Sequence, residues 1–307
     1  MKTILLTGAT GFLGSHLLEA LLKEGYSVVI LKRSSSNTWR IQHLLDQVKT
    51  YDVDCVPLEV AFRDQRIDTV IHTACQYGRN GEPIHKIVES NLMFGLKLLD
   101  AATFFNTDTF FNTDTFFNTD MFFNTDMLLQ KYLNAYTLSK KQFVEWLHLQ
   151  SEKIQVVNLK LEHIYGPKDD KTKFVPWVID QLERQVEEVK LTMGEQERDF
   201  VYIDDVISAY LLTLKKTMQM ERFTEFDVGT GMLTSVRNFV EEIKRAHETL
   251  YGKSNTLLHF GALPYSAGEM MTINVDNKLL TDLGWAFNIS IQAGITKIIS
   301  LKLQSDL

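Results

Sequence analysis

The sequence predicts an α/β protein in which a doubly wound parallel sheet is joined to a smaller C-terminal lobe. Short apolar stretches alternate with helical patterns over the first half of the 307-residue chain, and alternation of this kind produces parallel sheets. After about Gly166 the pattern loosens, and glycine and proline become more frequent. We therefore expect a sheet domain over residues 1–165, to which residues 206–231 return, and a second lobe over 166–205 and 232–307.

The first predicted strand and helix enclose a glycine-rich turn. The apolar run 4–6 precedes Gly8, Gly11 and Gly14, and leucines at helical spacing follow as far as Gly25. Glycines three residues apart permit a tight turn, close approach of the main chain to a pyrophosphate, and close packing of helix on strand. The start of the helix offers free N–H groups to an anion. This segment predicts a dinucleotide-binding site in a Rossmann-like sheet.

The later elements follow the same alternation. Strands are predicted over 27–31, 69–73 and 156–161, and helices over 84–102 and 206–214. Asp204 or Asp205 could cap the last of these helices. In a sheet of this kind, ligands bind at the carboxyl ends of the strands.

The residues after the second strand bear on which dinucleotide binds. An NAD site usually places a carboxylate there for the ribose diol, whereas this chain has Lys32, Arg33 and then three serines beginning at Ser34. A guanidinium and hydroxyls suit a 2′-phosphate, so NADPH is predicted, with Arg33 and Ser34 as contacts; NAD is the alternative. A solvated strand end would also account for Lys32 and Arg33. Asp54 is a candidate contact for the adenine amine. The alternative is that Asp54 is an ordinary loop residue without a role in cofactor binding.

Composition argues against several classes of protein. The net charge of −7 comes without a basic stripe, which disfavours nucleic-acid binding. The chain has neither an apolar run of roughly 20 residues nor a signal-peptide pattern, so a cytoplasmic protein without membrane contact is expected. Cys55 and Cys75 lack the spacing of metal ligands and the density of a disulfide scaffold, and no metal site is predicted.

Tyr136 and Lys140 are the candidate catalytic pair. They lie four residues apart on a predicted helix, which places both side chains on one face. An ammonium group beside a phenol is expected to lower the phenol pKa and to make it a usable acid or base, and the same lysine could hold the nicotinamide ribose. A surface tyrosine next to a lysine is the alternative. The glycine-rich turn upstream favours the catalytic interpretation.

The order and spacing of these motifs resemble the extended short-chain dehydrogenase/reductase family over nearly the whole chain. The segments that carry the resemblance are the glycine turn, His72-Thr73-Ala74, Asn91, Tyr136 with Lys140, 163–167 and 198–206. The resemblance implies cofactor contacts from residues of the turn and of the third strand, namely Thr10, Phe12, Leu13, Thr73 and Ala74.

The resemblance also implies a reaction. A nucleotide-sugar ketoreductase would use NADPH to reduce a 4-keto-6-deoxy or 3,6-dideoxy sugar for surface polysaccharide synthesis. Tyr136 would give its proton to the keto oxygen, Lys140 would tune Tyr136, and a threonine hydroxyl would hydrogen-bond the developing alkoxide. An NAD-dependent epimerase or dehydratase is the neighbouring alternative. A non-catalytic dinucleotide-binding protein is the alternative outside the enzyme class.

Further roles implied by the resemblance concern the substrate and the assembly. Arg198 would bind the nucleotide diphosphate, unless it forms an ion pair with Asp204 or Glu195. Lys173 is a second substrate contact. His163 would touch substrate or cofactor, or be a core histidine, whereas His72 is interpreted as structural. A homodimer through the helix over 84–102 and the helix of Tyr136 is expected.

A tract over 103–127 departs from the family pattern. Phe-Phe-Asn-Thr-Asp, followed by Thr or Met, occurs four times in succession, and duplication of one catalytic strand is the simplest account. Thr107 follows the preceding helix too closely to end a strand. Thr113 is the first choice for the catalytic hydroxyl, because it leaves room for a turn and lies 23 residues before Tyr136; Thr125 is the second. A six-residue slip preserves every side-chain direction, so the register is ambiguous.

Overall fold

The computed structural model describes residues 2–79, 81–104, 119–266 and 268–305. Two compact units make up the chain. The first comprises Met1–Lys160 and Tyr210–Phe226, and the second comprises Leu161–Ala209 and Asp227–Leu307. Thr113 lies outside the described residues.

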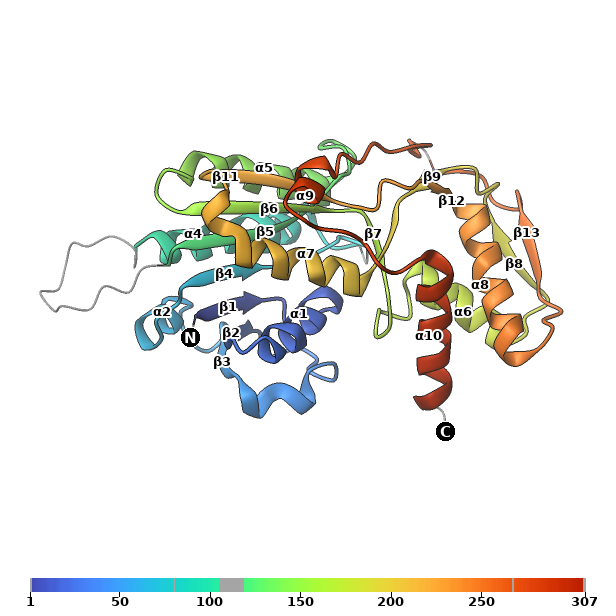
Figure 1. The fold of residues 1–307 in the computed structure, drawn as a ribbon, viewed down its shortest axis with the longest axis horizontal. Coiled ribbons are helices and arrows are strands. Elements are labelled where there is room, and N and C mark those ends of the chain that lie inside the picture. The colour runs from blue at the N-terminus through green and yellow to red at the C-terminus, as the bar shows by residue number, and fades with distance from the viewer. Residues whose placement is uncertain (1, 80, 105–118, 267, 306–307) are drawn as a thin grey trace, which may run out of the picture. The chain divides into compact units, whose positions relative to one another are not determined.

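A seven-stranded sheet forms the centre of the first unit (Figure 1). Its strand order is β11-β6-β5-β4-β1-β2-β3, and the pairs β1–β2, β2–β3, β1–β4 and β4–β5 are parallel. This arrangement confirms the predicted doubly wound fold. The strands are β1 (Thr3–Thr7), β2 (Ser27–Lys32), β3 (Lys49–Asp52), β4 (Thr69–His72), β5 (Met121–Met127), β6 (Gln155–Leu161) and β11 (Phe223–Val228).

The strand order reverses between β1 and β4. The chain proceeds from β1 to β2 and β3 on one side, and then returns to place β4 on the other side of β1. Sheets of this type bind ligands at such a switch point, outside the carboxyl ends of the strands. The glycine turn after β1 and the loop after β4 both leave the sheet at this point.

Helices pack against the apolar strands. One buried cluster joins α2, α4 and α5 to the sheet through residues such as Val70, Phe122 and Phe143. Each fully buried side chain of this size contributes about 1.5–3 kcal/mol. The helices and helical turns of this region are α1 (Phe12–Lys23), η1 (Gln42–Gln47), α2 (Glu59–Asp64), α3 (Ile84–Val88), η2 (Glu89–Met93), α4 (Phe94–Phe104), α5 (Ala135–Gln150) and η3 (Thr217–Gln219). Helix α7 (Ile203–Lys216) is divided, with residues 210–216 in this unit and 203–209 in the second.

The helix predicted over 84–102 is present, but it contains a π-helical turn. The turn, η2, separates α3 from α4 and carries Asn91. Turns of this kind are frequent at functional sites. Hydrophobic periodicity could not reveal it, because one wider turn leaves the apolar stripe nearly intact.

Among its described residues, the second unit contains three short strand pairs, four whole helices and the first part of α7. The pairs are β7 (His163–Tyr165) with β10 (Phe200–Tyr202), β8 (Glu188–Leu191) with β13 (Leu257–Phe260), and β9 (Glu197–Arg198) with β12 (Thr234–Ser235). The helices are α6 (Phe174–Glu183), α8 (Val236–Tyr251), α9 (Lys278–Asp282) and α10 (Ile291–Ser305). In this unit Asp205 is not a cap, because its carboxylate accepts hydrogen bonds from the backbone N–H groups of Asn288 and Ile289 at 2.8 and 3.0 Å.

In the part of the chain that the structure describes, no helix combines the length and the apolar character needed to cross a membrane.

Candidate active site

The glycine turn between β1 and α1 forms a cradle of main-chain atoms. Gly8 has φ of +72°, and a Cβ there would lie 2.6 Å from Thr73 Oγ1 and 2.7 Å from the backbone N of Ala74. A Cβ at Gly14 would overlap the carbonyl oxygen of Gly8. The helix begins after Gly11 without a side-chain cap, so its first N–H groups are available to an anion. The cradle therefore fits the pyrophosphate of a dinucleotide.

The loop after β4 is fixed to this cradle by hydrogen bonds. Thr73 Oγ1 donates to the Thr7 carbonyl at 2.8 Å, and the Ala74 N–H approaches Thr7 Oγ1 at 3.4 Å. Thr7 Oγ1 also contacts His72 Nδ1 at 2.7 Å. Burial, reinforced by the charge of Lys140, holds the pKa of His72 well below its ordinary value. His72 is thus a neutral residue that orders the ends of β1 and β4.

The ends of β2 and β3 combine cationic and acidic groups. The Arg33 side chain is exposed, whereas Ser34 is engaged twice: its hydroxyl donates to Asp52 at 2.8 Å and its N–H to Asp54 at 2.9 Å. Lys32 pairs with Asp52 at 3.4 Å. The contacts of Asp52 with Ser34 and Lys32 were not predicted from the sequence. A charged residue at the end of an edge strand is common and gives no sign of such contacts.

A second guanidinium lies at the glycine turn. Arg40 Nη1 donates to the carbonyl of Thr10 at 3.3 Å, and the Arg40 guanidinium lies over the ring of Trp39. The contact brings a positive charge close to the N-terminus of α1. Arg40 lies in a loop without a recognisable sequence motif, so the sequence offered only its positive charge as a sign of this contact.

The start of α5 positions Tyr136 and Lys140. Asn134 caps the helix: its side chain accepts from Thr137 N at 2.9 Å, and Thr137 Oγ1 accepts from the Asn134 N–H at 3.1 Å. Reciprocal capping of this kind fixes where a helix begins. Tyr136 is therefore held in the first turn of α5, with Lys140 one turn further on the same face.

Buried polar groups connect the start of α5 to η2 and to the loop after β4. Ser139 Oγ donates to the Tyr136 carbonyl at 2.9 Å, and Asn91 Nδ2 donates to Ser139 Oγ at 3.0 Å. The Asn91 side chain also accepts from Gln76 N at 2.7 Å and donates to Gln76 O at 2.9 Å. The π-turn thus ties the loop after β4 to the backbone of Tyr136.

The surroundings of Tyr136 raise its pKa. Burial is the largest cause, and Cys75, Tyr77 and Asp126 act in the same direction. The rings of Tyr77 and Tyr136 lie 4.9 Å apart. Lys140 is 2% exposed, and burial lowers its pKa. The net pKa of Tyr136 therefore lies above its ordinary value, whereas the sequence predicts a lowered one, because desolvation of the phenolate dominates.

The fourth copy of the repeat forms strand β5. Asn124 lies opposite His72 in the β4–β5 register. Thr125 Oγ1 contacts Tyr210 OH of α7 at 2.6 Å, whereas Asp126 contacts Lys141 of α5 at 2.7 Å. Neighbouring side chains of a strand point to opposite faces, so Thr125 faces α7 and Asp126 faces the helix that carries Tyr136. Sequence reasoning considered the threonines of the repeat and passed over its aspartates.

In the second unit, Arg198 is buried and paired. Its Nη2 lies 2.5 Å from Glu269 Oε1, and Nη1 donates to the Glu197 carbonyl at 2.7 Å. Asp204 pairs instead with Lys297 at 2.6 Å. The partner of Arg198 is thus neither of the two carboxylates considered from the sequence. Glu269 comes from an irregular segment 71 residues away, which spacing could not connect to Arg198.

Two other predicted contacts also lie in this unit. His163 on β7 is partly exposed, and its Nδ1 lies 2.9 Å from Oε2 of the buried Glu162. Its ring packs edge-on against Phe200. Lys173 occupies the N-cap position of α6.

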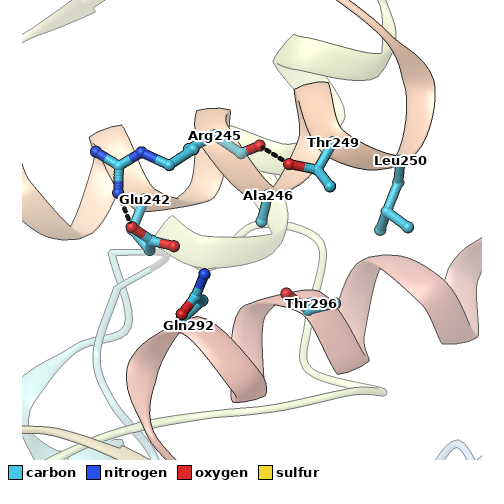
Figure 2. A pocket seen from close by; sticks show the side chains of 7 residues that line it. All are labelled: Glu242, Arg245, Ala246, Thr249, Leu250, Gln292 and Thr296. Carbon is cyan, nitrogen blue, oxygen red and sulfur yellow. Dashed lines mark hydrogen bonds and ion pairs between the residues drawn. The ribbon is translucent and has the colours of Figure 1, made fainter.

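Two adjoining cavities lie beside α8 in the second unit. The smaller, about 80 Å³, lies between α8 and α10, where Arg245 pairs with Glu242 (Figure 2). The larger, about 460 Å³, has Phe200, Phe239 and Ile291 among its lining residues. Its volume is within the range of small-molecule sites. Neither Arg198, Lys173 nor His163 lines either cavity.

Comparison with known proteins places these features in context. Residues 4–229 match the model of the NAD dependent epimerase/dehydratase family. The chain is 34% identical over 304 residues to CDP-abequose synthase of Salmonella muenchen, covering 98% of each chain. It is 35% identical to CDP-abequose synthase of Salmonella typhimurium, covering 96% of this chain and 97% of that protein.

Solved structures with the same fold are more distant in sequence. UDP-glucose 4-epimerase of Thermotoga maritima, solved with UDP-glucose, superposes with a TM-score of 0.81 at 22% identity, covering 99% of this chain and 100% of that chain. UDP-glucose 4-epimerase of Thermus thermophilus, solved with NAD, superposes with a TM-score of 0.77 at 21% identity, covering 97% of this chain and 98% of that chain. At this level of sequence identity, the two superpositions show a shared fold and nothing further.

Proposed function

This chain belongs to the NAD dependent epimerase/dehydratase family of the extended short-chain dehydrogenase/reductase fold, and from that premise we propose that it is a nucleotide-sugar ketoreductase. Its substrate is a nucleotide-linked 4-keto-6-deoxy or 3,6-dideoxy sugar, and its product serves surface polysaccharide synthesis. The observation that carries the proposal is the Tyr136–Lys140 pair on α5, where Tyr136 packs on Tyr77 of the loop that follows β4. Similarity to CDP-abequose synthase over nearly the whole chain supports the substrate class.

The residues of the site have separate tasks in this proposal. The main chain of the glycine turn binds the pyrophosphate, Thr73 and Ala74 contact the cofactor beside it, and a reduced nicotinamide supplies the hydride when bound. A phenol is protonated at neutral pH, and burial raises the pKa of Tyr136 further, so Tyr136 donates its proton to the keto oxygen. Lys140 orients Tyr136 and the ribose. For the hydroxyl that hydrogen-bonds the alkoxide, Thr113 is the first candidate by spacing and Thr125 the second. Thr125 Oγ1 would have to leave its contact with Tyr210 to take this role.

The substrate contacts lie in the second unit. Arg198 is proposed for the diphosphate, since its planar fork matches phosphate oxygens, and Lys173 and His163 for neighbouring parts of the ligand. Arg198 must then share its donors between Glu269 and the phosphate.

We propose NADPH as the preferred cofactor because of Arg33. Its exposed side chain follows β2, where a 2′-phosphate would lie. Arg33→Ala is expected to raise KM for NADPH about tenfold, in line with about 1.4 kcal/mol for one exposed charge-assisted contact, and to leave KM for NADH unchanged. Steady-state kinetics with both cofactors measures this.

Arg40→Ala is the matched control for Arg33→Ala. Arg40 lies at Thr10 of the glycine turn, which both dinucleotides share, so its loss should affect NADPH and NADH alike. Equal KM values for NADPH and NADH in the wild type would show that Arg33 does not bind the 2′-phosphate. An equal rise of both KM values in Arg33→Ala would show the same.

The proposed activity is tested with a panel of substrates. CDP-, dTDP-, GDP- and UDP-linked 4-keto-6-deoxy and 3,6-dideoxy sugars are incubated with NADPH, and formation of oxidised cofactor is followed by absorbance. Stoichiometric NADPH oxidation with one class of sugar identifies a ketoreductase. Interconversion of sugars without net oxidation of cofactor would instead identify an epimerase. NADPH binding without turnover on any sugar would favour a non-catalytic dinucleotide-binding protein.

The assembly is proposed to be a cytoplasmic homodimer through α3, α4 and α5. Large apolar side chains are exposed on these helices, including Ile84 at 69%, Trp146 at 46% and Leu149 at 64%. Trp146→Glu is expected to shift the protein from dimer to monomer, because it places a charge in an apolar interface. Sedimentation velocity measures the mass, and a wild type that sediments as a monomer would exclude this interface.

A further inference from the structure

A row of polar side chains crosses the sheet of the first unit, with one residue from each of five neighbouring strands. The strands are β1, β4, β5, β6 and β11. The residues are, in the same order, Thr7, His72, Asn124, Asn158 and Glu225. The first four are at most 1% exposed, and Glu225 is half-buried on an edge strand. We call this set the cross-strand network.

The hydrogen bonds of the network have a direction, which is set at Glu225. Asn158 Nδ2 donates to Glu225 Oε1 at 2.8 Å, and Asn124 Nδ2 donates to Asn158 Oδ1 at 2.8 Å. A carboxylate offers only acceptors, so it fixes which end of the Asn158 amide faces it. The Asn158 oxygen must then face Asn124, which orients the Asn124 amide in turn. The Asn124 oxygen Oδ1 is left without a donor on this side.

The network is interrupted between β5 and β4. His72 lies opposite Asn124 in the register of these strands, so the two side chains leave the same face of the sheet side by side. Asn124 Oδ1 and His72 Nε2 are both buried, and neither has a hydrogen-bond partner among the residues that the structure describes. An amide oxygen only accepts, so the two atoms match if His72 Nε2 carries a proton. The bond is made directly or through one buried water.

The other ring nitrogen of His72 indicates the same tautomer. Nδ1 lies 2.7 Å from Thr7 Oγ1, and Ala74 N approaches that oxygen at 3.4 Å. Because the N–H of Ala74 only donates, the Thr7 hydroxyl can give its own proton to Nδ1. A neutral imidazole has one N–H, and His72 is neutral because burial holds its pKa well below the ordinary value. The proton of His72 therefore belongs on Nε2, facing Asn124.

We propose that Glu225 fixes the tautomer of His72 from three strands away, and that the cross-strand network thereby holds Thr7 and the loop after β4 in place for the cofactor. All its bonds run from that loop towards the carboxylate, and hydrogen bonds in such chains strengthen one another. Glu225, Asn158 and Asn124 are positioning residues, because they act on the glycine turn through His72. Only the effect on the cofactor rests on the proposed function.

The tautomer is measured on the whole protein, without ligands and at neutral pH, by long-range ¹H–¹⁵N correlation spectra of ¹⁵N-labelled histidine. The His72 signals are those that disappear in His72→Gln. We expect the proton on Nε2 in the parent. Glu225→Lys replaces the terminal acceptor with a donor, and both asparagine amides must then turn round, so the proton is expected to move to Nδ1. Edge strands such as β11 tolerate lysine.

Three further variants separate the direction of the hydrogen bonds from charge. Glu225→Gln removes the charge but retains an oxygen acceptor, so the proton should stay on Nε2. Glu221→Lys makes the same change of charge at an exposed residue just before β11, and should also leave the proton on Nε2. Asn158→Leu interrupts the network without adding a charge, so a mixture of the two tautomers is expected.

The effect on the cofactor is measured as the Kd of NADPH by fluorescence quenching. A proton on Nδ1 would take from the Thr7 hydroxyl its acceptor at the glycine turn. Glu225→Lys is therefore expected to weaken binding about two- to tenfold, the effect of one hydrogen bond, whereas Glu225→Gln and Glu221→Lys should keep the parental Kd.

A parent with the proton on Nδ1 overturns the inference. So does a proton that stays on Nε2 in both Glu225→Lys and Asn158→Leu, when circular dichroism shows that these variants are folded. A changed tautomer with an unchanged Kd overturns the claim that the network holds the turn for the cofactor. A parent that binds no NADPH contradicts the proposed dinucleotide site, whereas the tautomer is measured without cofactor and is decided independently.

Discussion

Tyr136→Phe is expected to lower kcat for ketone reduction by about 10²- to 10⁴-fold, the range measured for loss of a positioned general acid. This corresponds to about 3–5 kcal/mol of transition-state stabilisation. The phenol O–H is the proposed proton donor, and a phenol is protonated at neutral pH. Because phenylalanine fills the same space, binding of NADPH should be unchanged. Steady-state kinetics gives the first quantity and quenching of protein fluorescence by NADPH the second.

Tyr77→Phe is the control for this experiment. Tyr77 has the same functional group and packs against Tyr136 at 4.9 Å, but it is 45% exposed and comes from the loop after β4. Its loss should change kcat by less than about tenfold, an effect typical of a supporting contact. If Tyr136→Phe retained more than about a tenth of the parental kcat, another group would have to supply the proton.

The sheet was predictable because the strands of the first unit are short and apolar and end at turn residues. Strands 27–31 and 69–73 were each placed within one residue of β2 and β4. The π-turn at Asn91 was not predicted, since it changes the helix without changing its apolar stripe. The register of the repeat was not predicted either, because four copies that share Phe-Phe-Asn-Thr-Asp give nearly the same pattern at every six-residue slip.

Site residues that lie close together in the sequence could be predicted from their spacing. Contacts between segments that are distant in the sequence could not. Tyr136 and Lys140 are separated by one helical turn, which the sequence displays. The pairing of Arg198 with Glu269 and the approach of Arg40 to Thr10 depend on tertiary structure. The direction of the Tyr136 pKa shift was also missed, because the degree of burial cannot be read from a spacing of four residues.

Gly14→Ala is expected to destabilise the protein and to weaken dinucleotide binding together. The added Cβ would overlap the carbonyl oxygen of Gly8 and would lie 2.9 Å from the Cα of Ala9. Both contacts are with backbone, so the clash can be relieved only by moving α1 away from β1. Overpacking of this kind costs roughly 1–3 kcal/mol, which corresponds to a fall in Tm of about 2–10 °C for a chain of this size. Thermal unfolding measures the change.

The same displacement of α1 moves the N–H groups that face the pyrophosphate, so the stabilisation by bound NADPH should shrink as well. Lys23→Ala at the exposed end of α1 is the control, because it alters the same helix without touching the turn. Measured with and without saturating NADPH, it should preserve the increase in Tm that the cofactor gives. If Gly14→Ala lowered Tm but kept the full increase with NADPH, the glycine would serve packing alone. The pyrophosphate would then have to be held by another part of the chain.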